Sequence, residues 1–155
     1  MRRSERSPFC LPVSAFVTYL GLVYLLSPLS VSGGQADAAA IRSKAATQHE
    51  IVMILLQKKE FDQAANEACK IFEMNWPSTE EPVLLTEIQI LSKKFQDDGQ
   101  TALALRILDT NMKSFKSTKS QVWIWKEKGY LYKKMGQNDK ALECFRNAQK
   151  LEEAK

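Results

Sequence analysis

The sequence predicts an all-α chain of paired helices that follow an apolar N-terminal segment. Past Ala39, apolar residues recur every three or four positions, which is the period of an α-helix. No stretch alternates between apolar and polar residues for long enough to predict a β-strand. The 155 residues are 45% hydrophobic and 26% charged, as in an ordinary globular protein. This composition excludes a collagen, a multi-span membrane protein and a disulfide-dense miniprotein.

The N-terminal segment, residues 1–38, has the pattern of a secretory signal peptide or of a single membrane anchor. A start with three arginines precedes an uncharged run that is mostly apolar from Phe9 to Val31. Residues 36–38, Ala-Asp-Ala, are the small residues typical of a cleavage site. The apolar run is also long enough to cross a bilayer as a retained anchor. Both interpretations place residues 39–155 outside the cytoplasm, either in the periplasm or attached to the inner membrane.

Residues 39–155 are expected to form one domain of three helical hairpins, at about 45–77, 83–115 and 121–153. Polar breaks, two of which contain glycine, separate the two helices of each hairpin. Longer polar segments separate one hairpin from the next, and Pro82 stands at the expected first turn of the third helix, where its missing amide proton has little cost.

Two of these hairpins share a turn. Gly99 lies five residues before Ala104, and Gly136 lies five residues before Ala141. A generic helical bundle would show the same helical period but not this repeated small-residue turn. We therefore expect an internal repeat.

The third hairpin resembles the tetratricopeptide repeat. The resemblance is carried by Trp125-x-x-Lys128-Gly129-x-x-Tyr132, followed by Ala141-x-x-x-Phe145 and Ala148. It is strong over residues 122–154 and weaker in the two earlier hairpins. Lys128 replaces an apolar residue of the family pattern, Glu153 replaces its terminal proline, and the repeats are longer than the family's roughly 34 residues.

The resemblance implies a helical solenoid that binds protein or peptide partners and carries out no reaction of its own. In such a solenoid the small residues let helices pack closely and the large aromatic residues fill the space between hairpins. The residues expected in this packing role are Ala64, Ala104, Trp125, Gly129, Tyr132, Ala141, Phe145 and Ala148.

The family geometry also implies a partner-binding groove lined by the first helix of each hairpin. In the third hairpin, the residues expected to face it are Trp123, Lys126, Glu127 and Tyr130. Two aromatic side chains there would be natural anchors, because aromatic residues dominate binding hot spots. The alternative is that Trp123 packs against the preceding hairpin.

The third hairpin and the segment before it are basic. Between Met112 and Met135 there are seven lysines and one acidic residue, Glu127. Such a concentration of charge can attract an acidic partner or an anionic membrane surface, or it can be a solvated helix face. A nucleic-acid partner is not expected, because the expected location is outside the cytoplasm and this basic segment contains no arginine for bidentate contacts to bases.

Catalysis, cofactors and metals find no support in the sequence. His49 is the one histidine, and the chain has no glycine-rich phosphate loop and no Cys-x-x-Cys. Cys69 and Cys144 fall in the second helices of different hairpins, so we expect no disulfide between them. The expected function is a non-catalytic adaptor in envelope assembly or secretion, with an accessory subunit of an envelope enzyme complex as the alternative. Self-association through an uncapped C-terminal hairpin is also expected.

Overall fold

The computed structural model describes residues 33–154 of the chain. Within these residues the chain is helical throughout and contains no β-strand, which confirms the predicted all-α class. The six α-helices are α1 (Gly33–Gln57), α2 (Phe61–Phe72), α3 (Glu81–Asp97), α4 (Thr101–Asn111), α5 (Thr118–Lys134) and α6 (Asn138–Glu153). Two short 3₁₀ segments, Ser78–Glu80 and Met112–Ser114, lie between hairpins.

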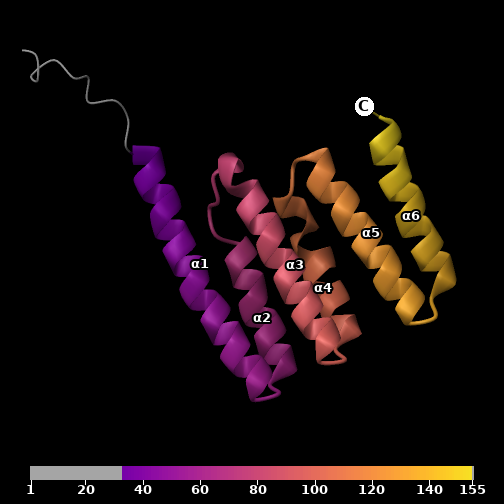
Figure 1. Cartoon of the computed structure of the whole chain (residues 1–155), viewed down its shortest axis with the longest axis horizontal. Helices are drawn as coiled ribbons and strands as arrows, with labels where there is room; N and C mark the ends of the chain where they lie inside the picture. Colours follow the sequence, from indigo (N-terminus) through magenta and orange to yellow (C-terminus); the bar gives the residue numbers. More distant parts are fainter. Residues whose placement is uncertain (1–32, 155) are drawn as a thin grey trace, which may run out of the picture. The chain divides into compact units, whose positions relative to one another are not determined.

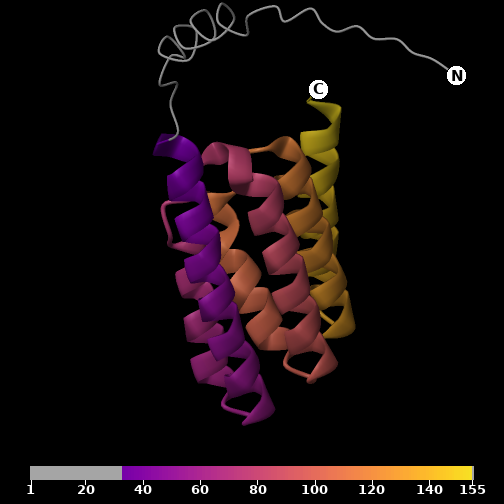
Figure 2. The same cartoon turned by 60° about the vertical axis from the view of Figure 1, so that its left-hand side comes forward.

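The helices form three antiparallel hairpins, α1 with α2, α3 with α4 and α5 with α6. Figure 1 shows the hairpins side by side in chain order. Figures 1 and 2 together place α1, α3 and α5 in one layer, with α2 and α4 behind them. The first helix of each hairpin therefore lies next to the first helix of the following one.

All three hairpins turn through the same backbone motif. Gly99 and Gly136 have φ of 75° and 74°, and Lys59 takes the equivalent place in the first hairpin with φ of 60°. In each turn the residue after this one donates to the carbonyl five residues earlier, at 2.9 Å for Glu60, 2.7 Å for Gln100 and 2.9 Å for Gln137. This is a common C-terminal helix cap, in which a residue in the left-handed region closes the helix. From the sequence, this shared turn could be recognised only in the second and third hairpins, where glycine occupies the left-handed residue.

The hydrophobic core runs through all three hairpins. It is built from the inward faces of α1 to α5 and from Phe115 in the connection before α5. Its largest fully buried side chains include Ile71, Leu84, Ile88, Leu91, Phe95, Leu108, Phe115, Ile124 and Leu131. The buried residues of α6 are small, namely Ala141, Cys144 and Ala148.

Polar contacts join neighbouring hairpins at the edges of this core. Arg42 of α1 pairs with Glu80 at 3.4 Å, and Nδ1 of His49 donates to Glu87 of α3 at 2.5 Å. Arg106 of α4 donates to Asn66 of α2 at 3.1 Å. Both layers are therefore connected from the first hairpin to the second.

The apolar run expected to be a signal peptide or anchor, Phe9–Val31, lies outside the described residues. The residues expected at its cleavage site, 36–38, belong to α1, which begins upstream of residue 45, and Ala38 is buried. Within the part of the chain that the structure describes, no helix combines the length and the apolar character needed to cross a membrane.

Candidate protein-binding site

The outward side of α1, α3 and α5 presents an uninterrupted row of accessible side chains. We call it the first-helix face and define it by the exposed residues Glu50 and Gln57 of α1, Val83, Ile90 and Lys93 of α3, and Tyr130 and Lys134 of α5. On α3 this side is opposite to the buried residues, so the helical period alone places it in solvent.

Two apolar residues on α3 are exposed on this face. Val83 and Ile90 each have 42% of their surface exposed. They lie seven residues apart, two helical turns, and therefore on the same side of the helix. They are not among the groove residues predicted from the sequence. Their seven-residue spacing, outside the pattern of buried residues, would have indicated an exposed apolar side of this helix. Large exposed apolar side chains on one face are typical of a contact surface.

The two aromatic residues expected in the groove differ in their surroundings. Tyr130 is 59% exposed and packs edge-on against the ring of Phe145, with ring centroids 5.2 Å apart. Trp123 is half-buried and packs against the hydrophobic core. The Tyr130 ring is therefore accessible to solvent on one side and supported by Phe145 on the other, whereas much of the Trp123 side chain is covered by the core.

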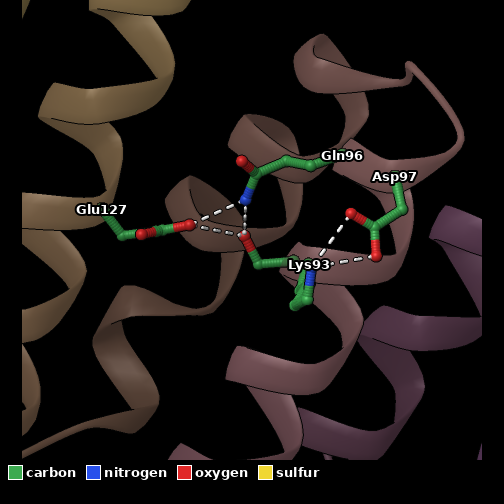
Figure 3. A network of polar contacts seen from close by, with 5 residues as sticks. Lys93, Gln96, Asp97 and Glu127 are labelled. Atoms are coloured by element: carbon green, nitrogen blue, oxygen red, sulfur yellow. Dashed lines mark hydrogen bonds and ion pairs between the residues drawn. The ribbon is translucent and has the colours of Figure 1, made fainter.

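Glu127 ties α5 to α3. Nε2 of Gln96 donates to its carboxylate at 2.7 Å, and the hydroxyl of Ser92 donates to the same oxygen at 3.4 Å (Figure 3). Within α3, Lys93 also pairs with Asp97 at 3.0 Å (Figure 3). The carboxylate of Glu127 is thus engaged by its own chain.

Lys126 is turned toward the second helix of its hairpin. Its Nζ lies 2.7 Å from the carboxylate of Glu152 on α6, and both side chains are about half exposed. The four residues that the sequence singled out, spaced i, i+3, i+4 and i+7, lie on one side of α5, but their side chains make different contacts. Tyr130 is accessible on the first-helix face, while Lys126 and Glu127 point to different neighbours.

The close contact between α5 and α6 depends on Gly129. A Cβ atom at this residue would lie 2.7, 2.8 and 3.0 Å from three ring atoms of Phe145. The alanines expected in packing roles, Ala64, Ala104, Ala141 and Ala148, all have at most 4% of their surface exposed, and Trp125 and Tyr132 are half-buried.

Lys128 is buried where the family pattern has an apolar residue. Its Nζ pairs with Asp109 of α4 at 2.5 Å and lies 4.2 Å from the ring centroid of Trp125. The ammonium is therefore compensated by a carboxylate and by an aromatic face. Burial raises the pKa of the Tyr132 hydroxyl, and the negative charge of Asp109 adds to this shift. Burial also raises the pKa of the Cys144 thiol, which the charge of Lys128 opposes.

The start of α5 is held by Glu81 of α3. Its carboxylate accepts hydrogen bonds from the backbone amides of Lys116 and Ser117, both at 3.0 Å, and from the Ser117 hydroxyl at 2.6 Å. Partial burial alone would raise the pKa of Glu81, but hydrogen bonds from Ser117, Ser120 and the two amides lower it to about 2. Glu81 is therefore ionised at neutral pH, and its hydrogen bonds fix the start of α5 beside α3.

No feature of the described residues 33–154 resembles a metal centre, since no group of three histidine, cysteine or carboxylate side chains could hold an ion. Cys69 of α2 and Cys144 of α6 are free thiols. An open hollow of about 1060 Å³ lies between the start of α1 and residues 73–75, away from the first-helix face.

The stacked hairpins and their accessible first-helix face define a helical-repeat protein with a surface suited to binding another protein. Residues 122–154, which cover most of α5 and all of α6, match the family model of the tetratricopeptide repeat. The third hairpin is therefore similar to a tetratricopeptide repeat, which confirms the resemblance found in its sequence. No curated protein and no solved structure matches the chain.

Proposed function

We propose that this protein is a non-catalytic adaptor that binds a segment of a partner protein on its first-helix face. Tetratricopeptide repeats serve protein–protein interaction, so the class of function follows from the third hairpin. The observation that carries the proposal is the exposure of Val83, Ile90 and Tyr130 on adjacent first helices. These side chains supply apolar anchors, and Lys93 and Lys134 lie beside them for acidic groups of the partner.

The binding proposal is tested by affinity capture with single-residue variants. Ile90→Asp and Tyr130→Ala should each weaken capture of a specific partner at least about tenfold, because truncating a central anchor has that order of effect. Ile51→Asp is the matched control, since Ile51 is also an exposed isoleucine on a first helix, and helical spacing places it about 100° around α1 from Glu50 of the first-helix face. Circular dichroism verifies that each variant keeps its helical content. If Ile90→Asp retains every partner, this face is not the binding site.

The adaptor acts, in our proposal, outside the cytoplasm in envelope assembly or secretion. The support is the sequence of residues 1–38, in which a basic start precedes a long apolar run. Fractionation combined with intact-mass measurement separates the two forms of this proposal. A soluble exported chain beginning near Ala39 would indicate a cleaved signal peptide, and a full-length chain in the membrane fraction would indicate an anchor. A full-length chain in the cytoplasmic fraction would contradict both.

A further inference from the structure

The contact between the first two hairpins shows how a first helix of this chain receives a neighbouring helix. Arg42 and His49, seven residues apart on α1, contact Glu80, which immediately precedes α3, and Glu87, seven residues later within α3. Two helical turns separate the members of each set, so both polar contacts lie along one line between parallel helices. Apolar side chains between them complete the contact.

The same basic register recurs on α5. Counted back from the shared turn, Lys119 and Lys126 occupy the places that Arg42 and His49 occupy before Lys59. Lys119 is exposed, and the side chain of Lys126 is 45% exposed. The side of α5 that corresponds to the α3-binding side of α1 therefore carries two lysines in the matching register, of which Lys126 is paired with Glu152 of α6.

An apolar residue beside this row is uncovered in the third hairpin alone. Counted forward from the turn, Ala65, Leu105 and Leu142 are equivalent. Ala65 and Leu105 have 0% and 9% of their surface exposed, whereas Leu142 is 49% exposed. The outer side of α5 and α6 thus offers an exposed leucine and two lysines, which are the apolar and the charged elements of a helix-binding surface.

The charges on this surface favour an acidic partner over a second copy of the chain. Glu152 of α6 already faces Lys126, but Lys119 has no carboxylate within ion-pair distance among the described residues. In a head-to-tail copy, α1 would have to supply the carboxylates, and it has Ala40 and Thr47 at the places equivalent to Glu80 and Glu87. Its own basic residue Lys44 would face the lysines instead.

We propose that the outer side of α5 and α6 binds an amphipathic helix of a partner protein, with carboxylates seven residues apart beside an apolar stripe. The surface is defined by Lys119, Lys126 and Leu142. It adjoins Tyr130 of the first-helix face, which lies four residues from Lys126 on α5, so the bound helix would lie along the edge of that face. The charged pairs set the register of the bound helix, because like charges at those places would repel it.

The test uses a synthetic peptide with the sequence of residues 78–98, which carries Glu80 and Glu87 with the apolar stripe of α3. Its binding to the full-length protein is measured by fluorescence anisotropy. We expect saturable binding that the double variant Lys119→Glu/Lys126→Glu weakens at least tenfold. A peptide with Glu80→Lys and Glu87→Lys should bind this double variant better than it binds the unchanged protein.

Two controls make the result specific. The double variant Lys94→Glu/Lys113→Glu has the same net charge but alters other exposed lysines, and it should bind the peptide as the unchanged protein does. Ile90→Asp should also leave peptide binding unchanged, which distinguishes this surface from the α3 part of the first-helix face. Absence of saturable binding, equal loss in the control, or no rescue by the charge-reversed peptide would overturn the proposal. So would a dimer in sedimentation that Lys119→Glu/Lys126→Glu dissolves, since the occupant would then be a second copy.

Discussion

Replacing Gly129 by alanine tests whether the third hairpin depends on close packing of the Phe145 ring against the backbone of α5 at Gly129. The new methyl group would stand 2.7 Å from the nearest ring atom of Phe145. Non-bonded carbon atoms are most stable at about 3.5–4.0 Å, so the ring or one of the helices must move by about 0.8 Å. Overpacking of this kind costs about 1–3 kcal/mol. Alanine recovers about 0.5–1 kcal/mol, because it favours the helical backbone more than glycine does.

We therefore expect Gly129→Ala to lower the free energy of unfolding by about 1–2 kcal/mol. Urea unfolding followed by circular dichroism measures this change. The matched control introduces the same alanine into a Phe145→Leu background, where the clashing ring atoms are gone. There the helix preference of alanine should dominate, and the substitution should stabilise the protein by about 0.5 kcal/mol. Equal or greater stability of Gly129→Ala in the unchanged background would refute the steric argument.

Three further substitutions test the turn, the hydrogen bonds of Glu81 and the buried cation. Lys59→Gly should stabilise the protein by about 1 kcal/mol in urea unfolding, because Lys59 has a left-handed backbone, whereas Lys58→Gly at the end of α1 should not. Glu81 has a lowered pKa, so its contribution is present above the unfolded value of 4.5 and is lost as the pH falls from there toward about 2. Glu81→Gln should remove this acid-dependent loss and about 1 kcal/mol of stability near pH 7, after allowance for solvent screening. Asp109→Ala should destabilise more than Lys128→Met does, because it leaves a buried ammonium without its carboxylate, whereas methionine removes the charge. A larger loss for Lys128→Met would show that the pair itself is strongly stabilising.

The sequence predicted the paired helices because their burial has a simple period. Ala104 and Ala141 follow their turns at a fixed distance, and the small residues at these places are buried in the structure. The break at residues 58–60 was predicted, but the backbone motif that it shares with the other two turns was not, because Lys59 takes a conformation that glycine usually marks. The conformational cost of a left-handed lysine is tolerated here because the packed helices on either side determine the path of the chain.

The candidate site was harder to predict, since helical spacing gives the side of a helix but not the partner of a side chain. Lys126 and Glu127 are adjacent, yet one meets Glu152 on α6 and the other meets Gln96 on α3. Those contacts depend on how far apart neighbouring helices lie and on which polar side chains they offer. Ile90 was not predicted as a site residue, because the helical period identifies the buried stripe of α3 and assigns no role to an apolar residue on the opposite, exposed side.

The contacts that join α1 and α5 to the second hairpin differ in exposure. Arg42 of the Arg42–Glu80 pair is half exposed whereas Lys128 of the Lys128–Asp109 pair is buried, and this difference predicts which contact salt will weaken more. Glu87 is equivalent to Ile124 in the next hairpin when both are counted back from the turn. Glu87 receives a hydrogen bond from His49, whereas Ile124 is fully buried in the core. Raising the salt concentration from about 0.1 to 1 M shortens the screening length from about 10 to 3 Å, which weakens exposed ion pairs such as Arg42–Glu80. Hydrogen exchange in α1 should therefore accelerate relative to α5 at high salt, and a uniform response of the two helices would show that apolar contacts dominate both junctions.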